Sequence, residues 1–293
     1  MVSLLLSVLL MLGDVDPAAH RREIAAWQKA RDARLRADGG WLTLAGLFWL
    51  KPGANRFGCA TTNDIVLPAG SAPASAGTFV VEHGQVSVEL LPTVIATIAG
   101  KPVKTKVTLR SDSGGAEPDV LALGALTLQV IERDGRLAIR LKDLNSPVRR
   151  DWKGLRYYPT QLSYRVVARF VPHPRPVSIA LPNMLGFSET APSPGYAEFE
   201  LGGKTFRLDP VIEAPGDSVL FFVFRDQTSG KTTYGAGRFL YADPPKDGRI
   251  VLDFNKAYTP PCGFTPYATC PLPPPQNRLG VAVEAGELYD GHR

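Results

Sequence analysis

The segment Gly77–Leu91, GTFVVEHGQVSVELL, decides the fold class of this chain. Apolar and polar residues alternate at Val86, Val88 and Leu90, and Glu82–Gln85 separates the two halves of the segment with a turn. Alternation with a period of two around a short turn is typical of an antiparallel hairpin that buries one face. The segment therefore predicts an antiparallel β-sandwich.

Short apolar runs of the same kind extend in both directions from this hairpin. The 28 glycines and 26 prolines among the 293 residues fall between these runs and favour strands and turns over a helical bundle. The chain is long enough for two domains. We expect an antiparallel β-sandwich over residues 41–144, a basic and aromatic linker over 145–158, and a second antiparallel sandwich or barrel over 159–293.

One helix is expected before the first strand, within residues 16–40. Asp16 is suited to the N-cap and Pro17 to the first helical position, while Gly39 and Gly40 end the pattern. The helix is amphipathic with a strongly basic face. That face is either solvated or meets a membrane surface or an acidic partner.

Residues 1–15 form an apolar N-terminus that has the length of a signal-peptide core. Val2–Leu12 is too short for the roughly 20 residues of a membrane span. The segment predicts a secreted or periplasmic protein without a stable membrane span, or a cytoplasmic one if these residues pack as an apolar N-terminus. The net charge of +5 includes no long run of like charges, so no nucleic-acid partner is implied and a protein partner stays unknown.

The segment Asp253–Leu279, DFNKAYTPPCGFTPYATCPLPPPQNRL, contains seven prolines. Proline fixes φ and removes a backbone donor, so these residues predict an extended strap, 253–279, that closes the second domain. Cys262 and Cys270 are the candidates for a disulfide in an oxidising compartment, or they form a reduced structural pair. Their spacing fits no common zinc site, and we expect no metal and no cofactor.

Several phrases of the chain resemble one family. The matching phrases are GWLTLAGLFWLKPGANRFG at Gly40–Gly58, the stretch Gly154–Pro159, GAGRFLY at Gly235–Tyr241, and the strap. Together they resemble the uncharacterised bacterial and archaeal family catalogued as domain of unknown function 1684. That resemblance implies no catalytic residue and no cofactor, so the function has to come from the residues themselves.

A fainter likeness lies in the first half, where the order of glycines and strands is similar to a forkhead-associated (FHA) sandwich. FHA domains bind phosphothreonine through an arginine, and Arg56 could stand in its place. The serine and histidine pattern is absent, and Ala99 precedes Gly100 where the family has asparagine. The resemblance implies an FHA-like fold without phosphopeptide reading, and leaves Arg56 as the docking residue of a non-catalytic structural or protein-interaction module.

The segment Phe221–Tyr241, FFVFRDQTSGKTTYGAGRFLY, is the main site candidate. Tyr234 and Arg238 share one face of the predicted hairpin, Arg225 enters from the opposite strand, and alternate glycines invite a close neighbour. Either these arginines border a cleft for a small polar or anionic ligand, or they bond the carbonyl groups of the strap. The complete set of candidate ligand contacts is Arg225, Tyr234, Arg238, Asn255, Tyr258, Asn277 and Arg278.

Two further groups of residues carry alternative functions. Asp253 and Glu287 are weak candidates for the acid and base of a carboxylate-dependent hydrolase, provided that they meet and that burial raises the pKa of one of them. Arg149 and Arg150 in the linker form a secondary anion patch, because ligands commonly bind in clefts between domains. The sequence does not decide whether the protein is an enzyme.

Overall fold

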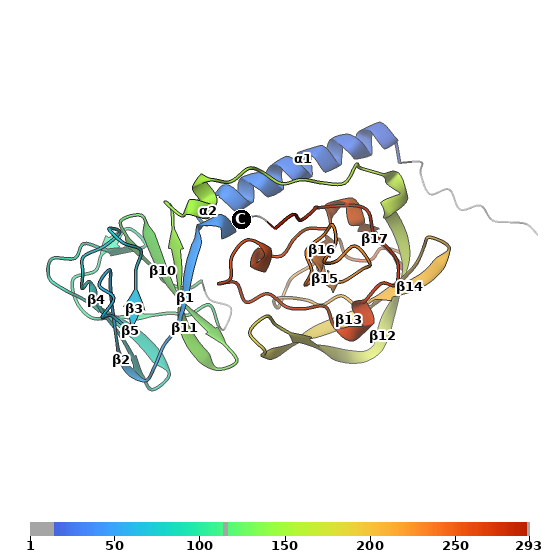
Figure 1. Cartoon of the computed structure of the whole chain (residues 1–293). Helices are drawn as coiled ribbons and strands as arrows, with labels where there is room; N and C mark the ends of the chain where they lie inside the picture. The colour runs from blue at the N-terminus through green and yellow to red at the C-terminus, as the bar shows by residue number, and fades with distance from the viewer. Residues whose placement is uncertain (1–14, 114–116, 292–293) are drawn as a thin grey trace, which may run out of the picture.

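The structure, a computed structural model, describes residues 15–113 and 117–291. Strands make up 42% and helices 14% of the chain, which confirms the mostly β class. Two β bodies lie side by side, and one long helix runs along the second of them (Figure 1). In the part of the chain that is described, no helix is long and apolar enough to cross a membrane. Residues 1–14 of the predicted signal peptide lie outside the described residues.

Helix α1 (Pro17–Arg36) confirms the predicted N-terminal helix. The side chain of Asp16 caps it by accepting hydrogen bonds from the backbone N–H groups of Ala18 and Ala19, at 2.9 and 3.1 Å. Four residues at helical spacing are buried on its inner face: His20, Ile24, Arg31 and Leu35. Two of these four carry a polar or charged group, which the apolar pattern alone did not reveal.

The first body is a sandwich of two sheets. Its strands are β1 (Leu44–Trp49), β2 (Gly53–Gly58), β3 (Ile65–Val66), β4 (Gly77–Glu82), β5 (Gln85–Leu90), β6 (Thr97–Ile98), β7 (Lys101–Pro102), β8 (Val107–Leu109), β9 (Val120–Leu123), β10 (Leu126–Arg133) and β11 (Arg136–Asp143). One sheet has the order β3-β2-β4-β5-β8 and the other β1-β11-β10-β9-β6-β7. Phe57 and Phe79 from the first sheet share a core with Leu128 and Ile139 from the second, so the two sheets pack face to face.

The hairpin that predicted this sandwich is strands β4 and β5. They pair antiparallel from Gly77 opposite Leu90 to Glu82 opposite Gln85. Val86 and Val88 are buried in the core as the alternation requires. The antiparallel prediction for this segment is confirmed.

The second body contains a four-stranded sheet and a two-stranded one. Its strands are β12 (Arg165–Pro182), β13 (Ser188–Leu201), β14 (Lys204–Leu208), β15 (Leu220–Phe224), β16 (Arg238–Ala242) and β17 (Arg249–Asp253), and the short helix α2 (Pro147–Arg150) precedes them. The larger sheet has the order β14-β13-β12-β17, and β15 pairs with β16. These sheets are not closed into a barrel. Gly202 and Gly203, both with positive φ, form a two-residue turn between β13 and β14.

The strap crosses the sheets of the second body as extended chain with single turns of 3-10 helix. These turns are Phe254–Lys256, Pro261–Gly263 and Pro275–Asn277. Isolated bridges tie the strap to the strands, joining Tyr258 to Phe239 and Arg278 to Arg225. The prolines therefore leave the strap few regular hydrogen bonds, and it is fixed by contacts with the sheet beneath it.

The strap also approaches one glycine of the hairpin, Gly237, closely. A Cβ atom at Gly237 would lie 2.6 Å from the carbonyl oxygen of Phe224 and 2.7 Å from Cγ of Pro273, and the φ of Gly237 is +112°. Neither the space nor the backbone conformation admits a side chain there. This agrees, for Gly237, with the expectation that another segment packs against the alternate glycines, whereas a Cβ at Gly235 would meet only Gly230 of the same loop.

We expect Gly237→Ala to lower the free energy of unfolding by about 1–3 kcal/mol, since the methyl group displaces the strap and strains φ. Urea unfolding measures the change. Gly235→Ala is the matched control, because its Cβ would meet Gly230 at an ordinary 3.6 Å. Equal stability of the two variants would contradict a close contact at Gly237.

The two bodies meet in a mixed apolar cluster. Leu44 at the start of β1 packs with Phe221, Phe239 and Cys270 of the second body. The hydroxyl of Thr265 in the strap donates to the carbonyl oxygen of Leu44 at 3.3 Å. The strap and the first strand thus hold the bodies together, while the predicted domain boundaries stay a prediction.

Candidate functional site

Strand β11 carries cations on the face of the sandwich that points away from its core. Its sequence alternates, so that Leu137, Ile139 and Leu141 pack in the core while Arg136 and Arg140 project from the opposite face. β11 lies between β1 and β10 in the sheet. Its outer face is covered by the second body, so these basic residues lie at the junction.

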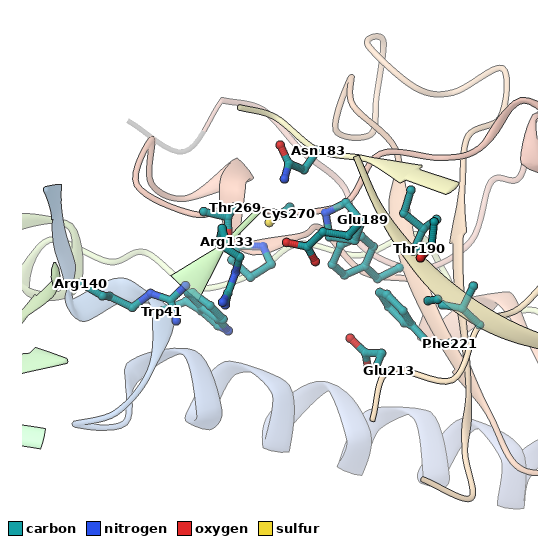
Figure 2. Close-up of a pocket in the computed structure, with 16 residues that line it drawn as sticks. Trp41, Arg133, Arg140, Asn183, Glu189, Thr190, Glu213, Phe221, Thr269 and Cys270 are labelled. Carbon is teal, nitrogen blue, oxygen red and sulfur yellow. The ribbon is translucent and has the colours of Figure 1, made fainter. Parts of the chain in front are cut away.

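A cavity of about 480 Å³ lies between the two bodies. From the first body, Trp41, Arg133 and Arg140 line it; from the strap, Thr269 and Cys270 do so. Figure 2 shows this cavity with the two arginines on one side and residues of the second body on the other. Its volume falls in the range of about 300–1,000 Å³ that small-molecule sites occupy.

The side chain of Arg140 has no hydrogen-bond or ion-pair partner among the described residues. It is only 9% exposed, and its Nε atom is buried without a hydrogen bond. The structure gives its guanidinium no hydrogen bond and no ion pair, and its Cζ lies 5.6 Å from the centroid of the Trp41 ring. Burial lowers the pKa of Arg140, although an arginine stays protonated in a protein. The cavity wall therefore presents an uncompensated positive charge.

The neighbouring cations are already satisfied. Arg133 forms a bidentate ion pair with Asp112, at 3.0 and 2.9 Å. Lys142 donates from Nζ to the carbonyl oxygen of Gly39. Of these three neighbouring cations, Arg140 is therefore the one that is available to bind a ligand.

Carboxylates line the opposite wall. Glu189 of β13 and Glu213, in the loop between β14 and β15, both border the cavity. The hydroxyl of Tyr241 donates a hydrogen bond to Glu213. Loss of solvent raises the pKa of Glu213, and the Tyr241 hydrogen bond opposes that rise.

A second cavity of about 720 Å³ adjoins the first. Trp41, Glu213, Phe239 and Pro261 line both, so the two form one cleft. The walls of the second cavity also include residues of α1, namely Trp27, Arg31 and Arg34, and three more residues of the second body, namely Tyr241, Lys256 and Tyr258. The helix is therefore one wall of the cleft.

Cys262 and Cys270 lie side by side at the edge of this cleft. They are free thiols, and the backbone N–H of Cys262 donates to Sγ of Cys270 at 3.2 Å. The contact with Cys270 lowers the pKa of Cys262, while the same contact and burial raise the pKa of Cys270. The predicted disulfide between them stays a prediction.

The structure places the arginines of the predicted hairpin cleft in different surroundings. Arg238 is fully buried; its guanidinium pairs with Asp226 at 2.8 Å and donates to the carbonyl oxygens of Val283 and Ala285. Arg225, directly after β15, is exposed. The prediction that both border a cleft is corrected, because Arg238 points into the core and offers no surface to a ligand.

The remaining candidates of that set are mostly structural. The amides of Asn255 and Asn277 are buried and bond the backbone at Gln161, and at Asp209 and Val223. The hydroxyl of Tyr234 donates to the carbonyl oxygen of Cys262 at 3.1 Å, and Arg278 is exposed. Of the seven predicted ligand contacts, Tyr258 lines the cleft.

The two carboxylates of the predicted acid–base pair are buried but apart. Asp253 accepts a hydrogen bond from Nε2 of His20 at 2.7 Å, and Glu287 accepts one from Nε of Arg31 at 2.9 Å. His20 and Arg31 are eleven positions apart on α1, which places them about 16 Å apart along the helix. The prediction that Asp253 and Glu287 act together is therefore corrected: each one fixes a different part of α1.

The other predicted anion-binding arginines are engaged in ion pairs. Arg149 pairs with Asp38 at 2.6 Å, and Arg150 pairs with Asp151 at 2.9 Å. Arg56 donates to the carbonyl oxygen of Thr62 at 3.2 Å and lies 3.8 Å from a carboxylate oxygen of Asp64. In the described residues, no group of three or more His, Cys, Asp or Glu side chains could hold a metal ion.

Sequence reasoning missed Arg140, Glu189 and Glu213. A pattern does point to the first, because arginines alternate with core residues in β11. Such an alternation ordinarily indicates a solvated face, and nothing in the local pattern shows that a second body covers it. Glu189 and Glu213 belong to segments without any motif.

Comparisons with known proteins give the following matches. The family model "Protein of unknown function (DUF1684)" matches residues 150–288. The solution NMR structure of an uncharacterised protein from Haloarcula marismortui is 36% identical and covers 48% of this chain and 80% of its own, with a TM-score of 0.42. Comparison with curated proteins finds no match.

Two structures of FHA domains also match. One is the FhaA FHA domain in complex with the intracellular domain of Rv3910, which covers 33% of this chain and 97% of its own. The other comes from an analysis of phosphothreonine-dependent FHA interactions and covers 33% of this chain and 92% of its own. Each is 18% identical to this chain with a TM-score of 0.23.

Proposed function

This chain belongs to the DUF1684 family, whose function is unknown, and we propose from its own geometry that it binds a small anionic ligand in the cleft at Arg140. The ligand class is the one that the sequence predicts. The site differs: it lies between the two β bodies, with the strap as part of its wall, instead of beneath the strap at Arg238.

The observation that carries this proposal is the unpaired guanidinium of Arg140. Removing a charge from water without a partner is costly, and buried charges in proteins are therefore paired or bound to a ligand. The same protein satisfies its other buried arginines, Arg31 and Arg238, with carboxylates. An anion bound at Arg140 would give this buried arginine a negatively charged partner, as Arg31 and Arg238 already have.

The surroundings of Arg140 suit a ligand of modest size. Trp41 supplies an aromatic surface beside the guanidinium, and Phe221 and Phe239 give the cleft an apolar floor. Sites for small molecules typically combine such apolar walls with a few polar groups that fix orientation. These residues come from elements far apart in the chain, so the site exists only in the folded protein.

The two alternatives from the sequence receive less support from the contacts. A hydrolase that uses Asp253 and Glu287 needs both carboxylates to reach one substrate, whereas both are buried and bonded to residues of α1 that are eleven positions apart. A protein-interaction module that docks through Arg56 remains a hypothesis, with Asp64 and Thr62 as that arginine's present partners.

We expect at least one small anion to raise the Tm of the protein in a thermal-shift screen with phosphate, sulfate, acetate, succinate and citrate. A ligand at ten times its Kd adds about 1.4 kcal/mol, which corresponds to a rise of about 2–5 °C. Arg140→Gln should weaken that binding about tenfold or more, because a hydrogen bond to a charged group is lost.

Arg136→Gln is the matched control for this experiment. Arg136 lies on the same face of β11, stacked at 4.3 Å over Trp49, and does not line the cleft. Its substitution should leave anion binding unchanged. The proposal fails if no anion shifts the Tm, or if Arg140→Gln responds as the wild type does.

A further inference from the structure

The wall of the cleft that faces Arg140 carries two carboxylates, Glu189 and Glu213, that form no ion pair among the described residues. The structure gives Glu189 no hydrogen bond or ion pair among the described residues, and Glu213 has only the hydroxyl of Tyr241. Figure 2 shows both carboxylates pointing into the same opening as the arginines. Both carboxylates are exposed to solvent at the mouth of the cleft, whereas Arg140 is buried, so the acidic wall is open to a ligand cation without requiring one.

The opposite charges do not satisfy each other. Among the described residues, no ion pair within 4.0 Å joins Arg133 or Arg140 to Glu189 or Glu213. A simple anion at Arg140 leaves the two carboxylates of the same opening without a cation, and a simple cation beside the carboxylates leaves Arg140 without an anion. A molecule that carries both charges, separated by an apolar segment, satisfies both walls.

From this arrangement we infer that the ligand is a zwitterion, an amino carboxylate such as an amino acid or a short peptide with free termini. Its carboxylate binds Arg140, its ammonium group binds Glu189 and Glu213, and its apolar part lies on Phe221 and Phe239. This inference rests on the proposed function, since it assigns the anionic end of the ligand to the same arginine. It adds the acidic wall as the second determinant of specificity.

Matched compounds that differ only in charge test this inference. Isothermal calorimetry would compare the amino carboxylates alanine, γ-aminobutyrate, ε-aminocaproate and alanyl-alanine with butyrate and caproate, which lack the amine, and with butylamine and hexylamine, which lack the carboxylate. The amino carboxylates differ in the distance between their two charges, so the series samples a range of separations between Arg140 and the carboxylates. We expect at least one amino carboxylate to bind about tenfold or more tightly than its monopolar counterparts.

Substitutions on the acidic wall identify the second contact. In the double variant Glu189→Gln and Glu213→Gln, the preference for the amino carboxylate should disappear. Caproate should bind this variant at least as tightly as it binds the wild type. Glu200→Gln is the control, because Glu200 is exposed on the same strand as Glu189 and does not line the cleft. An unchanged Tm of each variant without ligand shows that the fold is intact.

The outcomes separate this inference from the proposed function. If butyrate and caproate bind as tightly as the amino carboxylates and depend on Arg140, anion binding stands and the zwitterion is refuted. If none of these compounds binds although inorganic anions raise the Tm through Arg140, the zwitterion is again refuted. If the amines bind best and Arg140→Gln has no effect, both are wrong.

Discussion

Arg238→Leu is expected to lower the free energy of unfolding by about 3–5 kcal/mol, because it leaves the buried carboxylate of Asp226 without its cation. Neither side chain of this pair is exposed, and they lie 2.8 Å apart. The guanidinium also satisfies the carbonyl oxygens of Val283 and Ala285, which follow the strap. The substitution therefore disrupts one buried network that joins the hairpin to the C-terminal segment.

Urea unfolding followed by circular dichroism measures this loss. Arg225→Leu is the matched control: Arg225 precedes the same connection but is exposed, so the change should stay within about 0.5 kcal/mol. A stability of Arg238→Leu near that of the wild type would show that Arg238 is not a core residue. It would also restore the hairpin as a candidate binding site.

Arg31→Leu is expected to lower the free energy of unfolding by about 3–5 kcal/mol at neutral pH, since Glu287 would remain buried without a cation. Glu287 is 0% exposed and accepts hydrogen bonds from Arg31 and from the backbone N–H of Thr259. Burial raises the pKa of Glu287 above its ordinary value of 4.5, and Arg31 opposes this rise. Removing Arg31 raises that pKa further.

The pH dependence of the loss follows from this shift. In the variant, the folded state keeps the proton of Glu287 to a higher pH than the unfolded chain does, so stability falls as pH rises from 4.5 through the folded-state value. The difference from the wild type should thus be small in acid and grow toward neutral pH. Urea unfolding at several pH values measures it, with Arg21→Leu, an exposed position on α1, as the control. A difference that is constant with pH would contradict an ion pair with Glu287.

The sequence predicts the parts of this fold that local patterns encode. The hairpin at Gly77–Leu91 and the turn at Gly202–Gly203 follow from alternation and turn residues within a few positions. The helix cap at Asp16 is equally local. Each of these features is fixed by neighbours in the chain, so each is visible without coordinates.

The candidate site is not local, and its prediction was accordingly less successful. Arg31 has the same appearance in the sequence as the exposed arginines of α1, because its partner Glu287 is 256 positions away. Arg140 and Arg238 are both arginines on strands with apolar neighbours. Arg238 is paired in a core, whereas Arg140 is unpaired in a cleft. This difference depends on which segment covers each strand.

The docking of α1 has a consequence for how the protein folds. The helix is synthesised well before its two buried partners, because Asp253 lies 233 positions after His20 and Glu287 lies 256 positions after Arg31. Contacts over such separations form late, because the loops that they close carry a large entropy cost. During translation α1 has no place to dock until the strap has left the ribosome. The cleft, of which the helix is one wall, therefore closes as one of the last events of folding, and a nascent or truncated chain should lack it.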